Sequence, residues 1–392
     1  APAIRFQGFT DDWEQRKFSN IVNRVSQQSN DSNLPKVEFE DIISGEGRLN
    51  KDISSKFDSR KGTVFEPEFI LYGKLRPYLK NWLFPNFKGI ALGDFWVFEP
   101  NNSSSIFDYY LIQSDKYQTV ANLSSGTKMP RSDWKTVSET VFSIPDSINE
   151  QEKIGAFFKH LDNTIALHQR KLTLLKQLKQ TYLQALFPQS ELNIPTLRFA
   201  RFSDSWEHRK VSSLAKETFG GGTPKTGVKK YWKGSFPWIQ SSDLTTNQLH
   251  NVQPTKFITE EAIKQSATHN VPGNSIAIVT RVGVGKLALM RSSYSTSQDF
   301  LSLSNLNVDA VFGVYCLYKM LQREVNNIQG TSIKGITKAD LLGKCVSVPT
   351  KVEEQVKIGA FFKKIDDTID FHESKLKHIL ELKKAFLEKM FL

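Results

Sequence analysis

The chain has 392 residues, and its 52 Lys and Arg outnumber its 41 Asp and Glu to give a formal net charge of +11. This length predicts two or three domains, and the basic balance favours a polyanionic partner, either nucleic acid or an anionic membrane surface. Two cysteines without a Cys-x-x-Cys pair exclude a disulfide-rich scaffold and a zinc ribbon. No apolar run approaches the roughly 20 residues that span a bilayer and no apolar targeting core is present, so we expect a reducing, cytoplasmic setting.

Two segments occur twice along the chain. Residues 2–17 return at 195–210 with nine of sixteen positions identical, and residues 148–187 return at 352–391 with nineteen of forty identical. The stretches between them share only a few matching residues. A repeated frame around two divergent stretches predicts one task performed twice, on two different targets.

The repeated 40-residue segment predicts a long helix in each copy. Its apolar residues recur at alternating spacings of three and four, from Ile154 to Leu186 and from Ile358 to Met390, which is a heptad seam. The simplest way to bury two such stripes is against each other. The internal symmetry then predicts an antiparallel pair of helices with a globule near each end.

Each helix is expected to begin with a capping box, because Ser147 precedes Glu150, and Thr350 precedes Glu353, by three residues. The resulting domain boundaries are 1–147 for the first globule with its repeated N-terminal segment, 148–188 for the central helix, 189–350 for the second globule with its repeated segment, and 351–392 for the C-terminal helix.

Polar residues occupy matched positions in the predicted seam: His168 and His372, and Lys179 and Lys383. One interpretation is a buried polar device that sets the register of the helices or responds to pH. The other is a partly exposed seam from which the lysines extend into solvent, and we favour this second interpretation.

The globules read as mixed α/β or α+β domains. Short strand-like runs are separated by Gly- and Asn-rich breaks, and the clearest are Phe69–Tyr72, Asp94–Phe98, Ser275–Thr280 and Phe300–Leu303.

Signatures of catalysis are missing from the sequence. There is no GxxxxGK[ST] phosphate loop, no Asn-Pro-Pro-aromatic or Asp-Pro-Pro-aromatic string of an amino-methyltransferase, and no GxSxG elbow. The single Pro-Asp pair, at 145–146, lacks the Glu-x-Lys spacing of a nuclease. We therefore expect a chain with no catalytic and no metal-binding residues of its own.

Basic residues interleaved with aromatic, Ser and Thr residues mark candidate nucleic-acid contacts. In the first globule they lie at 72–82 and 124–132, and the candidates are Lys74, Arg76, Lys80, Thr127, Lys128 and Arg131. In the second globule the glycine-rich stretch 220–232 and the regions after it supply Thr223, Lys225, Lys229, Lys230, Ser241, Ser242, Arg281, Lys286, Arg291, Thr331, Ser332 and Lys334. The alternative is that these stretches are ordinary surface loops and amphipathic strands with solvated lysines.

Three strings resemble a known family. EQEKIGAFFKHLDNTI (150–165) and EQVKIGAFFKKIDDTI (354–369) follow Ile-Pro and Val-Pro pairs, and GGGTPKTG…YW…FPWIQSSDL spans 220–244. Together with the two-copy arrangement they resemble the specificity (S) subunit of type I restriction-modification systems, over essentially the whole chain.

The resemblance implies two target-recognition globules joined by two long antiparallel coiled-coil helices. It implies a non-catalytic DNA-binding subunit of a bacterial defence system that reads a bipartite duplex and joins two methyltransferase (M) and two restriction/translocase (R) subunits. S-adenosylmethionine, ATP and Mg²⁺ would then belong to the partner subunits, which methylate and cut the DNA. The resemblance also implies that the family's helix-start and subunit-interface positions correspond to Glu150, Gln151, Glu354 and Gln355 of this chain.

Two other interpretations stay open: a stand-alone nucleic-acid-binding adaptor on the same frame, and an atypical nuclease or methyltransferase. The charge divides unevenly between the globules. Residues 14–147 hold 17 basic and 17 acidic residues, whereas residues 207–350 hold 17 basic and 9 acidic, a net charge of +8. The second globule should therefore show the steeper salt dependence of DNA binding.

Overall fold

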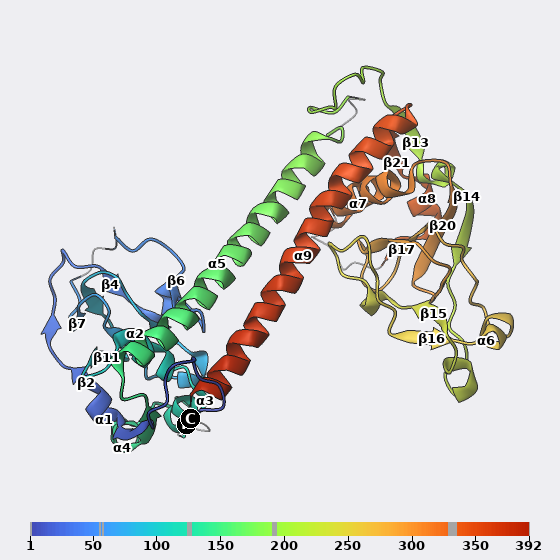
Figure 1. Ribbon diagram of the computed structural model, residues 1–392. Coiled ribbons are helices and arrows are strands. Elements are labelled where there is room, and N and C mark those ends of the chain that lie inside the picture. The colour runs from blue at the N-terminus through green and yellow to red at the C-terminus, as the bar shows by residue number, and fades with distance from the viewer. Residues whose placement is uncertain are drawn as a thin grey trace. The chain divides into compact units, whose positions relative to one another are not determined.

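The computed structural model describes residues 2–54, 56, 59–123, 128–189, 194–327 and 335–391. The chain forms two compact units, the first Ala1–Arg170 with Glu373–Leu392 and the second Lys171–His372. Each unit holds one globule and a stretch of both long helices, α5 (Ile148–Ala185) and α9 (Val352–Met390) (Figure 1). The two predicted helices are confirmed, and the compact units divide the chain within these helices.

The helices pack in antiparallel fashion within each unit. In the first unit the ring of Phe157 lies 5.0 Å from that of Phe386, and Asp162 lies 2.6 Å from Lys383. Residue numbers thus increase along α5 where they decrease along α9. In the second unit Tyr182 contacts Phe361 at 4.9 Å in the same sense. None of the predicted seam residues is exposed, which confirms the heptad pattern.

The described part of the first globule contains short strands, four short helices and two 3₁₀ turns. Its elements are β1 (Glu14–Lys17), α1 (Phe18–Ile21), β2 (Val22–Val25), β3 (Gln28–Ser29), β4 (Lys36–Val37), η1 (Phe39–Asp41), β5 (Ile42–Ile43), β6 (Arg48–Leu49), β7 (Gly62–Phe65), β8 (Ile70–Gly73), η2 (Pro77–Leu79), β9 (Trp82–Leu83), β10 (Gly89–Ala91), β11 (Phe95–Pro100), α2 (Ser105–Leu111), α3 (Asp115–Ala121), α4 (Trp134–Glu139) and β12 (Val141–Ile144).

The second globule repeats this plan with longer elements. Its elements are β13 (Glu207–Lys210), η3 (Val211–Leu214), β14 (Ala215–Gly220), η4 (Lys229–Trp232), β15 (Phe236–Ile239), η5 (Ser241–Asp243), β16 (Lys256–Ile258), α6 (Glu260–Lys264), β17 (Ser275–Val279), β18 (Leu287–Met290), β19 (Ser295–Thr296), β20 (Phe300–Leu306), α7 (Ala310–Asn327), α8 (Lys338–Gly343) and β21 (Cys345–Val348).

The main sheets of the two globules share one strand order although their sequences diverge. The main sheet of the first has strand order β2-β11-β8-β9, and that of the second has β14-β20-β17-β18, both antiparallel. Each globule also has one parallel pair, β4 with β10 and β15 with β19. The four strand-like runs expected from the sequence are confirmed as parts of β8, β11, β17 and β20, whose residues are mostly buried.

The repeated N-terminal segments recur because each one packs on the helices of its own unit. Phe6 lies 5.9 Å from Phe157, and the matching Phe199 lies 6.0 Å from Phe361. The strand that ends each segment pairs with the strand that leads into the long helix, β1 with β12 and β13 with β21. The repeat therefore preserves a packing surface rather than a separate site.

The acidic residues at the two helix starts bind arginines instead of completing the expected capping boxes. The carboxylate of Glu150 accepts two bonds from the guanidinium of Arg5, at 2.7 and 2.8 Å, and one from the indole of Trp13. Glu354 accepts from Arg198 at the same distances, while Glu353 is exposed. Both carboxylates are buried away from water, and a buried charge is stable only when it is paired. Each one is paired by an arginine of the repeated N-terminal segment.

A glycine in each KIGAFFK string permits close contact with the globule. A Cβ atom at Gly155 would lie 2.5 Å from a side-chain carbon of Ile106, and one at Gly359 would lie 2.8 Å from the main-chain nitrogen of Phe312. Both neighbours stand in or beside the first turn of the helix that follows the main sheet. The two long helices thus seat directly against α2 and α7.

Our favoured interpretation of the seam lysines was wrong. Lys179 pairs with Asp366 at 2.6 Å, and their side chains are 6% and 11% exposed. Lys383 pairs with Asp162 at the same distance, with 13% and 22% exposed. The sequence pattern did not reveal that the facing helix supplies a carboxylate to each lysine, so that both ammonium groups stay in the seam. Of the matched histidines, His372 is buried. No helix in the described ranges is both long and apolar enough to cross a membrane.

Candidate nucleic-acid interface

Two of the predicted binding stretches meet in the first unit. Residues 74–81 connect β8 to β9 and are called the first basic turn. Residues 128–132 lie against it: Leu75 and Arg131 form an isolated bridge, and the amide of Arg76 donates to the carbonyl of Pro130 at 2.7 Å. The structure therefore brings the candidates Lys74, Arg76, Lys80, Lys128 and Arg131 onto neighbouring segments.

The second unit has an equivalent arrangement. Residues 280–286 connect β17 to β18 at the same place in the sheet and are called the second basic turn. The amide of Ile336 donates to the carbonyl of Thr280 at 2.8 Å, so the residues leading into α8 brace this turn as 128–132 brace the first. Lys286 donates from Nζ to the carbonyl of Ser241 at 3.1 Å, which joins two further candidates.

An aspartate supports each basic turn from the adjoining strand. The amide of Lys74 donates to the carbonyl of Asp94 at 2.9 Å, and that of Thr280 donates to the carbonyl of Asp299 at 2.7 Å. The Asp94 carboxylate also pairs with Arg131 at 3.1 Å. Sequence reasoning missed these aspartates, although a matched signal existed: each precedes a phenylalanine that begins the long central strand.

The glycine-rich stretch 220–232 is fixed at its start and exposed beyond it. Thr223 donates from its hydroxyl to Gln298 at 2.9 Å, next to the aspartate that supports the second basic turn. Lys225 and Lys229 are exposed, whereas Lys230 pairs with Glu261 at 2.6 Å, which raises the pKa of its ammonium group. Two of the three lysines are thus available to bind phosphate, and the third already has a carboxylate partner.

Lys256 is a further cation that sequence reasoning did not select. Its Nζ lies 5.9 Å from the ring of Trp232 and 5.6 Å from that of Trp238, and it donates to the Gln240 side chain at 3.1 Å. The ring contacts place it beside the glycine-rich stretch, because Trp238 donates to the carbonyl of Gly222 at 3.0 Å. A single lysine outside any basic run carries no sequence signal.

The remaining candidates lie elsewhere. Arg291 follows β18 at the end of the hairpin opposite the second basic turn and donates to Asn274 at 3.2 Å. Ser242 is exposed within η5. Four candidates fall outside the described residues, namely Thr127, Thr331, Ser332 and Lys334.

The four helix-start positions are buried inside their own units. Gln151 accepts from the amide of Ser104 at 2.8 Å and donates to the carbonyl of Pro145, and Gln355 does the same with Asp309 and Pro349. These two glutamines, with Glu150 and Glu354, join each helix start to its globule. A role for the four in contacts with partner chains stays a prediction.

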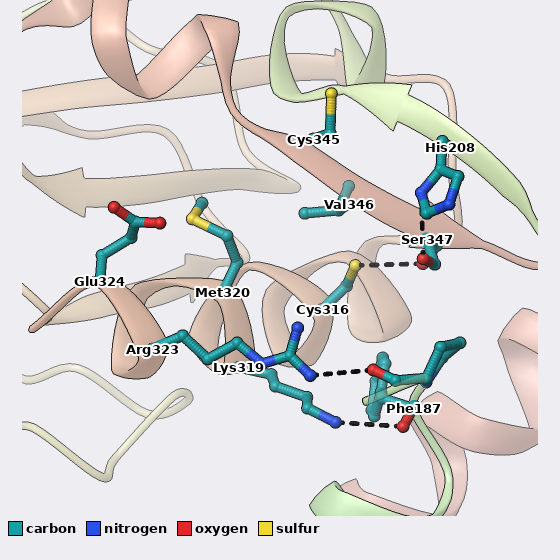
Figure 2. A pocket seen from close by; sticks show the side chains of 11 residues that line it. Phe187, His208, Cys316, Lys319, Met320, Arg323, Glu324, Cys345, Val346 and Ser347 are labelled. Carbon is teal, nitrogen blue, oxygen red and sulfur yellow. Dashed lines mark hydrogen bonds between the residues drawn. The ribbon is translucent and has the colours of Figure 1, made fainter. Parts of the chain in front are cut away.

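A hollow of about 240 Å³ in the second unit is lined by both cysteines and by basic residues of α7 (Figure 2). Lys319 donates to the carbonyl of Phe187 at 3.1 Å and Arg323 to that of Pro188 at 3.0 Å. Burial, with the neighbouring guanidinium, lowers the pKa of Lys319 to about 8. Both cations therefore bind the carbonyls just beyond the end of α5, where helix C-termini favour positive charge. Within the described ranges no three His, Cys, Asp or Glu side chains are grouped to hold a metal ion.

Two globules with matching main sheets, each packed on an antiparallel helix pair and each presenting a braced basic turn, define a duplicated two-module binding protein. The chain belongs to the type I restriction modification DNA specificity domain family, whose model matches residues 10–177 and again 203–381.

Relatives and solved structures agree with this family. The type I restriction enzyme MjaIX specificity subunit of Methanocaldococcus jannaschii is 30% identical over 182 residues, 45% of this chain and 41% of that protein. The EcoR124I/EcoR124II specificity subunit of Escherichia coli is 28% identical over 217 residues, 51% and 52% of the two chains. The matched regions thus span about half the length of these relatives or less.

Two solved structures resemble the whole chain in fold. The S subunit of a type I restriction-modification system from M. genitalium has a TM-score of 0.69 at 14% identity, covering 100% of this chain and 99% of that one. A chain from a study of complex assembly and conformational transition of the type I R-M system has a TM-score of 0.55 at 19% identity and 97% coverage of both. At these identities the likeness concerns the fold alone.

Proposed function

We propose that this chain is the non-catalytic DNA-recognition subunit of a type I restriction-modification complex, and that each globule reads one half of a bipartite duplex site. The observation that carries the proposal is the double match of the family model, once in each half of the chain. Two globules whose main sheets share a strand order but whose sequences diverge suit a reader of two different half-sites.

The charges of the described surface support a nucleic-acid partner. Each basic turn places Lys and Arg on a hairpin end that is braced by a second segment, and exposed Lys225 and Lys229 add cations in the second unit. Phosphate contacts of this kind fix the register of a protein on a duplex, while side chains between them read base edges.

The partners follow from the family and not from this chain's own residues. We propose that two M subunits and two R subunits assemble with it in the cytoplasm, and that they bind S-adenosylmethionine, ATP and Mg²⁺. We also propose that α5 and α9 act as the spacer between the half-sites, since both helices contribute residues to both units.

The test is reconstitution with duplex DNA and S-adenosylmethionine, with and without the cognate M subunits. The chain alone should bind DNA and transfer no methyl group, and the complex should methylate adenine within one bipartite sequence. Methyl transfer by the chain alone would overturn the non-catalytic role, and failure to bind the M subunits would favour a stand-alone adaptor.

A further inference from the structure

Each basic turn exposes a large apolar side chain at its tip. Tyr78 is 52% exposed in the first basic turn, and Val282 is 73% exposed in the second. Each apolar residue stands between cations of its own turn. Arg76 and Lys80 flank Tyr78, and the exposed Arg281 directly precedes Val282, while Lys286 at the end of the second turn binds the Ser241 carbonyl. The two turns occupy the same place in the main sheet but differ in length and share only an Arg and a Lys, so the exposed apolar residue belongs to that place in the fold.

The backbone of the first tip is held in a strained conformation. Arg76 and Lys80 both adopt left-handed backbone conformations, with φ of 49° and 55°, which side chains of this size rarely do. Between them Pro77 is buried, and the amide of Leu79 donates to the carbonyl of Arg76 at 2.8 Å. The amide of Gly45 also donates to the carbonyl of Lys80 at 3.0 Å. Such strain persists only where the surroundings enforce it, and it is concentrated at functional sites.

The second tip also exposes an apolar side chain on an anchored turn, but glycines adopt its left-handed backbone conformations. Gly283 and Gly285 supply the positive φ values, 91° and 97°, and the amide of Val284 donates to the carbonyl of Arg281 at 3.2 Å. Thr280 holds the base of the turn through its bonds with Asp299 and Ile336. Val282 is therefore presented from an anchored turn, as Tyr78 is.

We propose that Tyr78 and Val282 contact bases, each at the tip of a hairpin turn that enters a groove of duplex DNA while the flanking cations bind phosphates. This rests on the proposed function and names the residues that carry part of the specificity. An apolar side chain between cations matches the groove, where a thymine methyl group lies between two rows of phosphates. The core of a protein-binding patch is instead depleted of charge.

The two kinds of residue should respond differently to substitution. Tyr78→Ala should lower affinity for the preferred half-site about 10-fold and leave unrelated duplexes nearly unchanged, because one apolar base contact discriminates at one position. The double substitution Arg76→Ala with Lys80→Ala should weaken binding to all duplexes alike and reduce the salt slope. Val282→Ala should act as Tyr78→Ala does, but on the other half-site.

The experiment uses the full chain assembled with its M subunits. Selection from random duplexes defines the two preferred half-sites, and affinities are then measured for the selected duplex and its single-base variants. Val141→Ala on β12 is the matched control, because its side chain is exposed and apolar and its strand belongs to a different sheet from the one that ends in the first basic turn.

The outcomes separate the two proposals. A wild-type complex that selects no sequence overturns the proposed function. A selective wild-type complex whose Tyr78→Ala and Val282→Ala variants keep its full base preferences overturns only the present inference. Loss of the M subunits from these variants, with base preferences intact, would show that the tips bind protein and would overturn the inference as well.

Discussion

The carboxylate of Asp162 lies 2.6 Å from Nζ of Lys383, and the hydroxyl of Tyr110 donates to the same carboxylate at 2.9 Å. The second unit repeats this trio with Asp366, Lys179 and Tyr315, whose hydroxyl donates at 2.7 Å. Each trio joins α5, α9 and the helix that follows the main sheet. It fixes the register of the helix pair by a contact that a one-turn slip would break.

The trio of the second unit should contribute more stability than that of the first. Lys179→Met should destabilise the second unit by about 3 kcal/mol, because it leaves the Asp366 carboxylate buried without a counter-charge. Lys383→Met should cost less, since its partner Asp162 is more exposed. Hydrogen exchange of α5 and α9 peptides measures each unit separately.

A double substitution tests whether the lysine and the aspartate act as a pair. Lys179→Met with Asp366→Asn should cost less than the sum of the single changes by more than about 1 kcal/mol, because the second change removes the unpaired charge. Additive losses would show that each side chain contributes through packing alone.

The second unit should lose stability as the pH falls from 6.5 to 4. Burial lowers the pKa of His250 to about 4, and its Nε2 lies 3.1 Å from the Tyr315 hydroxyl. In the unfolded chain His250 binds a proton near pH 6.5, whereas in the folded unit it binds one only near pH 4. The neutral imidazole therefore contributes its full stability above pH 6.5, and this contribution is lost as the pH falls toward 4. The loss across this window is on the order of 3 kcal/mol.

His250→Gln should flatten that pH dependence. Asp366, whose pKa burial raises, titrates in both proteins, so the difference between the two stability profiles belongs to His250. Equal slopes between pH 6.5 and 4 in urea titrations of the two proteins would contradict the assignment.

Gly155→Ala and Gly359→Ala should each destabilise their own unit by about 1–3 kcal/mol. In an open helix this change stabilises by up to about 1 kcal/mol, but here the new methyl group would overlap Ile106 or the backbone at Phe312. The exposed neighbour offers the control, since Ala156→Gly should cost about 1 kcal/mol through helix propensity alone. Stabilisation by either glycine substitution would show that the close contacts relax freely.

The three lysines of the glycine-rich stretch should not count equally in DNA binding. Lys225→Ala and Lys229→Ala should each lower the slope of log affinity against log salt by about 0.9, the value for one phosphate contact. Lys230→Ala should change it less, because Glu261 already neutralises this ammonium group. Affinities for one duplex at several salt concentrations give the slopes. If Lys230→Ala changes the slope as much as the other two substitutions, Lys230 leaves Glu261 and binds a phosphate when DNA is bound.

Exchange of residues 211–350 for the globule of another family member should change one half-site only. The exchange must retain two contacts across its boundaries, the bond from Tyr315 to Asp366 and the bond from the Asp309 amide to Gln355. Mapping of methylated adenines in a host that carries the complex reads out both half-sites. A change in both would contradict the independence of the globules.

The sequence predicted the features that depend on local periodicity and on the repeat. Both long helices, their seam and four strands follow from spacing and composition alone. It did not predict the partner of Lys179, because periodicity places a residue on a face but does not say what lies opposite it some 190 positions later. The equivalence of the two basic turns was missed for a related reason: it follows from strand order, and the two turns differ in length and share only an Arg and a Lys.

The first unit is completed by a segment that is made long after its globule. Met390 and Phe391 lie in its apolar core, and the Phe391 ring lies 5.3 Å from that of Phe107. Glu373 is added 203 residues after Arg170, the end of the unit's first stretch. At roughly 5–20 residues per second the ribosome needs about 10–40 s for that interval. During this time the first globule has been synthesised but lacks the α9 stretch that covers its core, so its apolar surface stays uncovered until that stretch is made.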